Sequence, residues 1–162
     1  MFEFNLINRK NIKVIEACQD LGVTPLILNP LGKKRLASGL FTTNDLRGGK
    51  PNGPKPFGYK KLEKLNPLHV VQETVADRAK RRGGGNDLDR RMRGRRGSRA
   101  YEPEASMSVE VSSAQVAINY VIAKGGIPLV DVYNMETAQE VVACLGWQLT
   151  KDEVAMLDSA VD

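Results

Sequence analysis

The stretch of sequence that decides the fold runs from Ser112 to Asp162 and reads SSAQVAINYVIAKGGIPLVDVYNMETAQEVVACLGWQLTKDEVAMLDSAVD. Ser112–Gln115 is typical of a helix start, because the serine hydroxyl accepts from an unpaired backbone N–H and the glutamine amide reaches back to the cap. The apolar residues that follow recur at helical spacing, and Gly125 is placed to stop them. These signals predict a helix over residues 113–124.

The second half of this stretch predicts a strand and two more helices. Ile127–Val132 is short, β-branched and apolar, which is typical of a strand covered on both faces. Asn134 predicts the cap of a helix that ends at Gly146, and Thr150 begins a second capping box with Glu153. The first of these helices carries an apolar stripe of Ala138, Val141, Val142 and Leu145. Helix, buried strand and helix are typical of a parallel α/β protein, whose ligands bind where strands end.

Several segments of the chain, which follow one another in the correct order, resemble one known family. Gln115–Val130 and Ala143–Val154 closely resemble the carboxyl end of the aldo-keto reductases. Nearer the start of the chain, the ends of that family's sixth and seventh strands are similar to Glu3–Arg9 and to Leu28–Gly32 with Leu36–Gly39, respectively. Within the family, the chain looks most like the NADP-dependent oxidoreductases of photosynthetic eukaryotes.

The resemblance implies an α/β fold that is an incomplete (β/α)8, or TIM, barrel. Strands are predicted at Glu3–Ile7, Pro25–Asn29 and Ile127–Val132, and by order they are the last three of eight. A complete barrel needs about 250 residues, and three strands leave two open edges that invite self-association. We divide the chain into residues 1–80 (two strands with their helices, including Val70–Lys80), a disordered basic insertion at 81–111, and the last helix, strand and helix at 112–162.

The basic insertion accounts for the positive net charge. Between Arg78 and Arg99 there are nine Arg and one Lys against two Asp, a local charge of +8 within a total of +5, so the rest of the chain sums to −3. Three interpretations stay open: an artefact of gene structure such as translated intron, which we favour, a solvated loop without function, or an Arg/Gly tract that binds nucleic acid. No aromatic residue that could stack on bases lies within it.

Other classes of protein find little support in the composition. No apolar run approaches the ~18 residues of a membrane span, and the first residues are unlike a signal peptide. Cys18 and Cys144 are far apart in sequence, which favours buried reduced thiols over a disulfide. His69 is the only histidine, so no metal site is predicted. The resemblance implies a plastid or cytoplasmic location, and the sequence does not choose between them.

The resemblance also implies a reaction, hydride transfer from C4 of the nicotinamide of NADPH to the carbonyl carbon of a small molecule. In the family a Tyr donates the proton, supported by a Lys, an Asp and a His, because the developing alkoxide needs a poised donor. Those four residues come from the front half of the family's sequence, so no catalytic residue is assigned here. We expect His69, near a helix start, to be structural, Tyr59 to lie in a loop and Tyr120 to pack on a helix, and Tyr101 and Tyr133 also lack the proton-donor context.

Cofactor binding is the part of the site that the resemblance leaves in this chain. The loop after the second predicted strand is similar to the segment that faces the pyrophosphate of NADP, and its candidate residues are Leu28, Asn29, Pro30, Leu31, Gly32 and Lys33. Amides in a Pro/Gly turn followed by cations suit an anion. Many members of the family have an aromatic residue at the position of Leu28, where leucine offers only apolar contact.

The second half of the predicted cofactor site follows the last strand. Its candidate residues are Tyr133, Asn134, Thr137 and Glu140. Of the family's set at these positions only Glu140 is kept, and a cation that would bind the 2′-phosphate is replaced by Tyr133. Asp131, where the family often has Gly, adds a negative charge nearby. Both changes weaken the expected preference for NADP.

Our interpretation is therefore an NADP-dependent oxidoreductase of the aldo-keto reductase family, represented by a fragment that is inactive alone because it lacks the catalytic Tyr, Lys, Asp and His. The alternative, from another class, is a non-catalytic half-barrel remnant whose Arg/Gly loop binds nucleic acid or an acidic partner. Salt-dependent binding to an oligonucleotide, lost when residues 78–99 are removed, would distinguish the second from the first.

Overall fold

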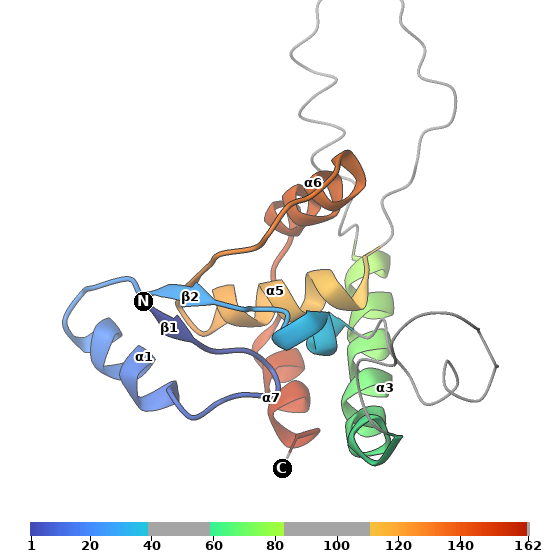
Figure 1. Cartoon of the computed structure of the whole chain (residues 1–162), viewed down its shortest axis with the longest axis horizontal. Coiled ribbons are helices and arrows are strands. Elements are labelled where there is room, and N and C mark those ends of the chain that lie inside the picture. Colours follow the sequence, from blue (N-terminus) through green and yellow to red (C-terminus); the bar gives the residue numbers. More distant parts are fainter. Residues whose placement is uncertain (39–58, 83–110, 162) are drawn as a thin grey trace, which may run out of the picture.

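The computed structural model describes residues 1–38, 59–82 and 111–161, in which three short strands form a parallel sheet (Figure 1). The strands are β1 (Phe2–Glu3), β2 (Leu26–Leu28) and β3 (Ile127–Pro128), and β2 lies between the other two. In the register, Ile27 of β2 stands opposite Phe2 on one side and Pro128 on the other. Strand order and direction confirm the predicted α/β class and agree with a partial (β/α) barrel.

Each strand is shorter than predicted, for local reasons. The side chain of Asn5 accepts hydrogen bonds from the backbone N–H of Ile7 and Asn8, which turns the chain out of the sheet after β1. Asn29 has a positive φ of 50°, so β2 ends at the residue before it. In β3, Pro128 has no N–H to donate, and the pairing ends with the bond from the Leu129 N–H to the Ile27 carbonyl.

The sheet buries one face and exposes the other. Ile27 is buried with Phe4 in the core, where the ring of Phe4 stacks on Tyr120 with centroids 6.0 Å apart. The opposite face carries a row of half-exposed apolar side chains, Leu26, Leu28, Ile127 and Leu129. The expectation that Ile127–Val132 is covered on both faces is therefore wrong for the described residues. Side chains alternate along a strand, and only one of the two faces is packed against helices.

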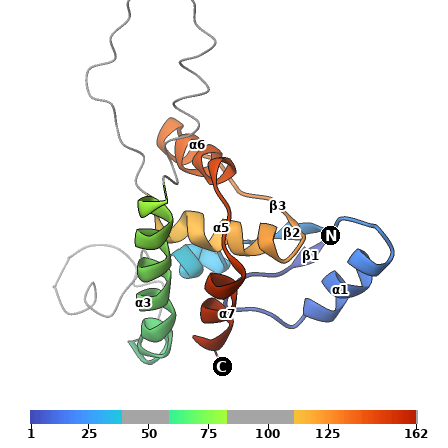
Figure 2. The same ribbon diagram turned by 180° about the vertical axis from the view of Figure 1, so that it is seen from behind.

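Helix α5 (Ser113–Ala123) is the centre of the core, and its prediction is confirmed. Ser112 caps it by accepting from the Gln115 N–H, and Gly125, with a φ of 89°, ends it. The second half of the expected capping box does not form, because the Gln115 side-chain oxygen is buried without a hydrogen-bond partner in the described structure. All residues from Ala114 to Val121 are buried, since α5 lies between the sheet and helix α3 (Figure 2).

Helix α3 (Tyr59–Arg81) is twice as long as the predicted Val70–Lys80. A helix seldom continues through a proline, and the predicted helix begins three residues after Pro67, but this proline lies inside α3. The buried residues of α3 recur at helical spacing on both sides of the proline: Leu62, Leu65, Leu68, His69, Gln72, Val75, Ala76 and Ala79. Packing of this stripe against α5 and α7 explains why the helix continues. Two expectations are corrected: Tyr59 begins a helix rather than lying in a loop, and His69 is inside the helix and buried.

Three elements follow β3: helix α6 (Met135–Val142), the 3-10 helix η2 (Ala143–Gly146) and helix α7 (Lys151–Ser159). The predicted caps at Asn134 and Thr150 are confirmed, the second as a complete capping box with Glu153. The apolar stripe predicted for α6 is only partly covered, since no residue of α6 is buried and Leu145 is 73% exposed. The remaining elements are α1 (Ile12–Asp20), at the outer side of the sheet, and the 3-10 helix η1 (Lys33–Ser38) (Figure 1).

Candidate cofactor site

A cavity of about 150 Å³ lies where the loops after β2 and β3 meet. Its lining residues are Asn29, Pro30, Leu31 and Gly32 from the first loop and Leu129, Val130, Asp131 and Tyr133 from the second. Five of the ten residues predicted to bind the cofactor are thus brought together from segments about a hundred positions apart. Carboxyl ends of parallel strands are where α/β folds bind their ligands, so this location is the expected one.

The first wall of the cavity is a tight turn that its sequence specifies. The Gly32 N–H donates to the Asn29 carbonyl at 2.8 Å, which closes a four-residue turn with Pro30 at its second position. Asn at the first, Pro at the second and Gly at the fourth position are typical of a β-turn. Both end residues have positive φ, 50° at Asn29 and 71° at Gly32, and at Gly32 this conformation favours glycine.

Two buried amide side chains fix the chain around this turn: Asn5 bonds to the turn itself, and Gln72 bonds to η1, which follows it. Asn5 donates to the Asn29 carbonyl at 3.0 Å, while its own oxygen accepts from the loop after β1. Gln72, at the other end, donates to the carbonyls of Ala37 in η1 and Ser113 at the start of α5, at 2.7 and 3.1 Å. Sequence reasoning missed both residues. A buried Asn or Gln amid apolar neighbours is the signal that could have found them, because such side chains must find partners.

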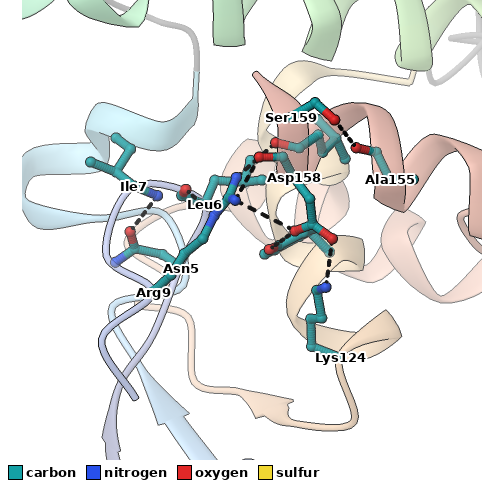
Figure 3. A network of polar contacts seen from close by, with 10 residues as sticks. Asn5, Leu6, Ile7, Arg9, Lys124, Ala155, Asp158 and Ser159 are labelled. Carbon is teal, nitrogen blue, oxygen red and sulfur yellow. Dashed lines mark hydrogen bonds and ion pairs between the residues drawn. The ribbon is translucent and has the colours of Figure 1, made fainter. Parts of the chain in front are cut away.

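The loop that contains Asn5 is itself fixed to α7 by Arg9 (Figure 3). The Arg9 guanidinium donates to the carbonyls of Leu157 and Asp158 at 2.7 Å each, and lies 3.6 Å from the Asp158 carboxylate. Asp158 also binds Lys124 at 2.8 Å. Burial alone would raise the pKa of the Asp158 carboxyl, but the hydrogen bonds from Lys124 and Tyr120 and the nearby positive charges lower it below its ordinary value. This network connects the site loops to the last helix.

The remaining predicted residues do not line the cavity. Leu28 is the last residue of β2 and 37% exposed, and Lys33 is exposed at the start of η1. Asn134 accepts from the Thr137 N–H and hydroxyl at 2.8 and 2.7 Å, so these two side chains satisfy each other at the start of α6. Glu140 accepts from the Ser112 hydroxyl at 2.8 Å. The cavity is lined instead by Leu129 and Val130, which are not among the predicted residues.

Asp131 is the one charged residue among those that line the cavity. Its side chain is exposed, and no interaction of its carboxylate is found in the described part of the chain. Tyr133, 81% exposed, presents a ring at the same place. The cavity thus combines apolar walls, amide groups, an aromatic ring and a carboxylate. Its volume is about that of a cavity able to hold a benzene-sized ring.

A larger hollow of about 440 Å³ lies between α5 and α7, lined by Asn119, Ile122, Ala123, Gln148, Leu149, Lys151 and Val154. It is not at the ends of the strands, and the amide of its buried Asn119 already donates to the Cys144 carbonyl at 3.1 Å. We therefore place the candidate site at the smaller cavity, whose position relative to the sheet matches the ligand sites of parallel α/β folds.

Other side chains that could in principle take part in a reaction have structural roles in the described part of the chain. The hydroxyl of the fully buried Tyr120 donates to the Asp158 carboxylate at 2.5 Å, which agrees with the expected packing role. Burial, together with the charge of Glu140, raises the pKa of the Cys144 thiol to about 12, so little of this thiol is in the thiolate form near neutral pH. No disulfide joins Cys18 and Cys144. Across residues 1–38, 59–82 and 111–161 no His, Cys, Asp and Glu side chains gather as a metal site.

The three strands are parallel, lie in the order β1-β2-β3 and are joined through helices, with a cavity at their carboxyl ends. This arrangement is that of a segment of a (β/α) barrel. In the part of the chain that the structure describes, every helix is too short or too polar to cross a membrane.

The chain belongs to the aldo/keto reductase family, whose model matches residues 2–162. It is similar to a chloroplastic pyridoxal reductase of Arabidopsis thaliana, with 25% identity over 161 residues. That match covers 98% of this chain and 34% of the relative, so the chain spans about a third of the length of the curated protein it matches. Membership confirms the resemblance seen in the sequence. The family consists of oxidoreductases that generally use NAD(P)H and act on small molecules.

Proposed function

We propose that this chain forms the nicotinamide-dinucleotide-binding part of an aldo-keto reductase and does not reduce carbonyl compounds by itself. The observation that carries the proposal is the cavity shared by Asn29–Gly32 and Tyr133, two segments selected from the sequence and brought together by the sheet. The bound dinucleotide would supply hydride for the reduction of a small carbonyl compound. The residues of this chain hold and orient it.

The roles follow from the chemistry of each group. In the turn at Asn29–Gly32, Pro30 has no N–H and the Gly32 N–H is bonded to the Asn29 carbonyl. The Leu31 N–H and the exposed ammonium of Lys33 are therefore the groups that face the pyrophosphate, since an N–H donor and a cation suit an anion. The ring of Tyr133 packs against a planar ring of the dinucleotide. We assign no residue of this chain to proton transfer, because Tyr120 is buried against Asp158 and His69 is buried within α3.

Titration of the pure full chain with NADH or NADPH, followed by coenzyme fluorescence, tests the binding. We expect saturable binding that Gly32→Val weakens about tenfold, because a β-branched residue does not tolerate the positive φ of this turn. Gly22→Val is the matched control, since Gly22 has a similar φ of 67° but lies outside the cavity in open space. Equal weakening by both variants, or no binding by the unmodified chain, would refute the proposal.

The second half of the proposal is tested by turnover. With NADPH and an aromatic aldehyde, the pure chain should oxidise no coenzyme above the rate without protein. A measurable rate that depends on the aldehyde would contradict the assignment of an inactive segment. The nucleic-acid alternative rests on the basic segment at residues 78–99, of which residues 83–99 lie outside the described part of the chain.

A further inference from the structure

We propose that the cavity between the β2 and β3 loops selects a dinucleotide without a 2′-phosphate, so that NADH binds in preference to NADPH, and that Asp131 determines this choice. The inference rests on the proposed function and deepens it, because it assigns the specificity of the same site. It reverses the preference for NADP that the resemblance implied.

The position of Asp131 allows it to contact a dinucleotide in the cavity. It lies three residues after β3, on the loop that forms the second wall of the cavity, and lines the cavity together with Tyr133. Its exposed carboxylate has no interaction within the described structure, so it can accept hydrogen bonds from a ligand. An acidic side chain near the carboxyl end of a parallel strand is a known way to bind the 2′-hydroxyl of a ribose.

The negative charge of Asp131 disfavours a 2′-phosphate. A 2′-phosphate adds nearly two negative charges, and none of the residues that line the cavity is a cation that could offset the repulsion from Asp131. At the start of α6 the Thr137 N–H is already bonded to Asn134, which leaves fewer N–H groups for a phosphate. Glu140 is held by Ser112. Of the described groups around this wall, Asp131 and Glu140 are anionic and none is a cation.

The other groups of the site do not distinguish the two coenzymes. Lys33 is the first residue of η1, directly after the first loop, and in our assignment it faces the pyrophosphate that NADH and NADPH share. Tyr133 contacts a planar ring, which they also share. Among the described residues that line the cavity, Asp131 is therefore the one that would discriminate between the coenzymes, and a single substitution tests it.

The experiment compares the dissociation constants of NADH and NADPH for the full chain and for Asp131→Asn. We expect NADH to bind about tenfold more tightly than NADPH to the unmodified chain, and Asp131→Asn to bring the two within about threefold, mainly by strengthening NADPH. Asp20→Asn, which removes the same charge from an exposed position at the end of α1, should leave the ratio unchanged. Raising the salt concentration should reduce the difference between coenzymes in the unmodified chain. Asp131 is exposed, so its substitution should not change the melting temperature.

The possible outcomes distinguish a failure of the coenzyme preference from a failure of the proposed function. Equal binding of both coenzymes, tighter binding of NADPH, or a ratio unaffected by Asp131→Asn would overturn the inference and leave the proposed function standing. Absence of binding by either coenzyme would overturn the proposed function and the inference with it.

Discussion

The buried side chain of Asn5 joins two loops that are separate in sequence. With 1% of its surface exposed, it accepts from the N–H groups of Ile7 and Asn8 and donates to the Asn29 carbonyl. The turn at Asn29–Gly32 could be predicted, because Asn-Pro-Leu-Gly specifies it locally. Its attachment to Asn5 could not, since no local pattern says where an amide will donate across 24 residues.

At this residue we predict that Asn5→Ala lowers the free energy of unfolding by about 2–3 kcal/mol and weakens binding of the dinucleotide, because it leaves buried backbone groups unpaired and releases the turn. Chemical denaturation and coenzyme titration measure the two effects. Asn11→Ala is the control, because Asn11 donates only to the Glu3 carbonyl, away from the site. If Asn11→Ala weakened the binding as much as Asn5→Ala, the positioning role of Asn5 would be wrong.

The two cysteines should differ in reactivity. Cys144 is 1% exposed and its thiol has a pKa of about 12, whereas Cys18 is partly exposed on α1. Because the thiolate is the reactive form, iodoacetamide at pH 8 should modify Cys18 first and Cys144 only after denaturation. Mass spectrometry of the labelled protein checks this order, and modification of Cys144 in the folded chain would contradict the packing around η2.

At the scale of elements, local signals predict helix starts better than strand lengths. Ser112, Asn134 and Thr150 all cap helices as expected, since a cap needs only neighbours within one turn. The length of α3 was missed because its continuation past Pro67 depends on packing against α5 and α7. Likewise Glu140, expected at the cofactor, is bound by Ser112, which lies 28 residues away.

Helix α7 should make the stability of the chain depend on acid pH. Burial would raise the pKa of the Glu153 carboxyl, but hydrogen bonds from Arg82 and Thr150 lower it below its ordinary value of 4.5. The folded pKa is thus below the unfolded one, so the contribution to stability is complete above about pH 4.5 and is lost as the pH falls through the folded pKa.

We therefore predict that Glu153→Gln lowers the free energy of unfolding by about 1–2 kcal/mol at pH 7 and by less in acid. Melting temperatures between pH 3 and 7 measure the difference. Asp152→Asn, which removes a charge from the exposed neighbour in the first turn of α7, should show a much smaller change. A destabilisation by Glu153→Gln that is the same at every pH would contradict the ion pair with Arg82.

The whole molecule exposes an apolar sheet face, and this has a consequence in solution. Leu26 and Ile127 stand opposite each other in the register, 38% and 47% exposed, on the face away from α5. In a complete barrel this face would point into the interior. This explains why strands whose sequence is typical of buried strands have an exposed apolar face here. We propose that the chain associates with itself through this face and the open strand edges.

Sedimentation velocity tests this association. We predict that the apparent mass rises with protein concentration, and that Leu26→Lys with Ile127→Lys suppresses the rise. Val23→Lys is the control, because Val23 is 55% exposed but lies before β2 rather than in the sheet. A single species of constant mass, or equal effects of the two substitutions and the control, would exclude association through this face.

The central claim, that the carboxyl ends of β2 and β3 bind a nicotinamide dinucleotide, is tested most directly by the amide spectrum of the ¹⁵N-labelled full chain titrated with NADH. We predict that the largest shifts fall on the two loops that line the smaller cavity, at Leu31, Gly32 and residues 131–133. No shifts at saturating coenzyme, or shifts confined to Asn119 and residues 148–154 around the larger hollow, would contradict it.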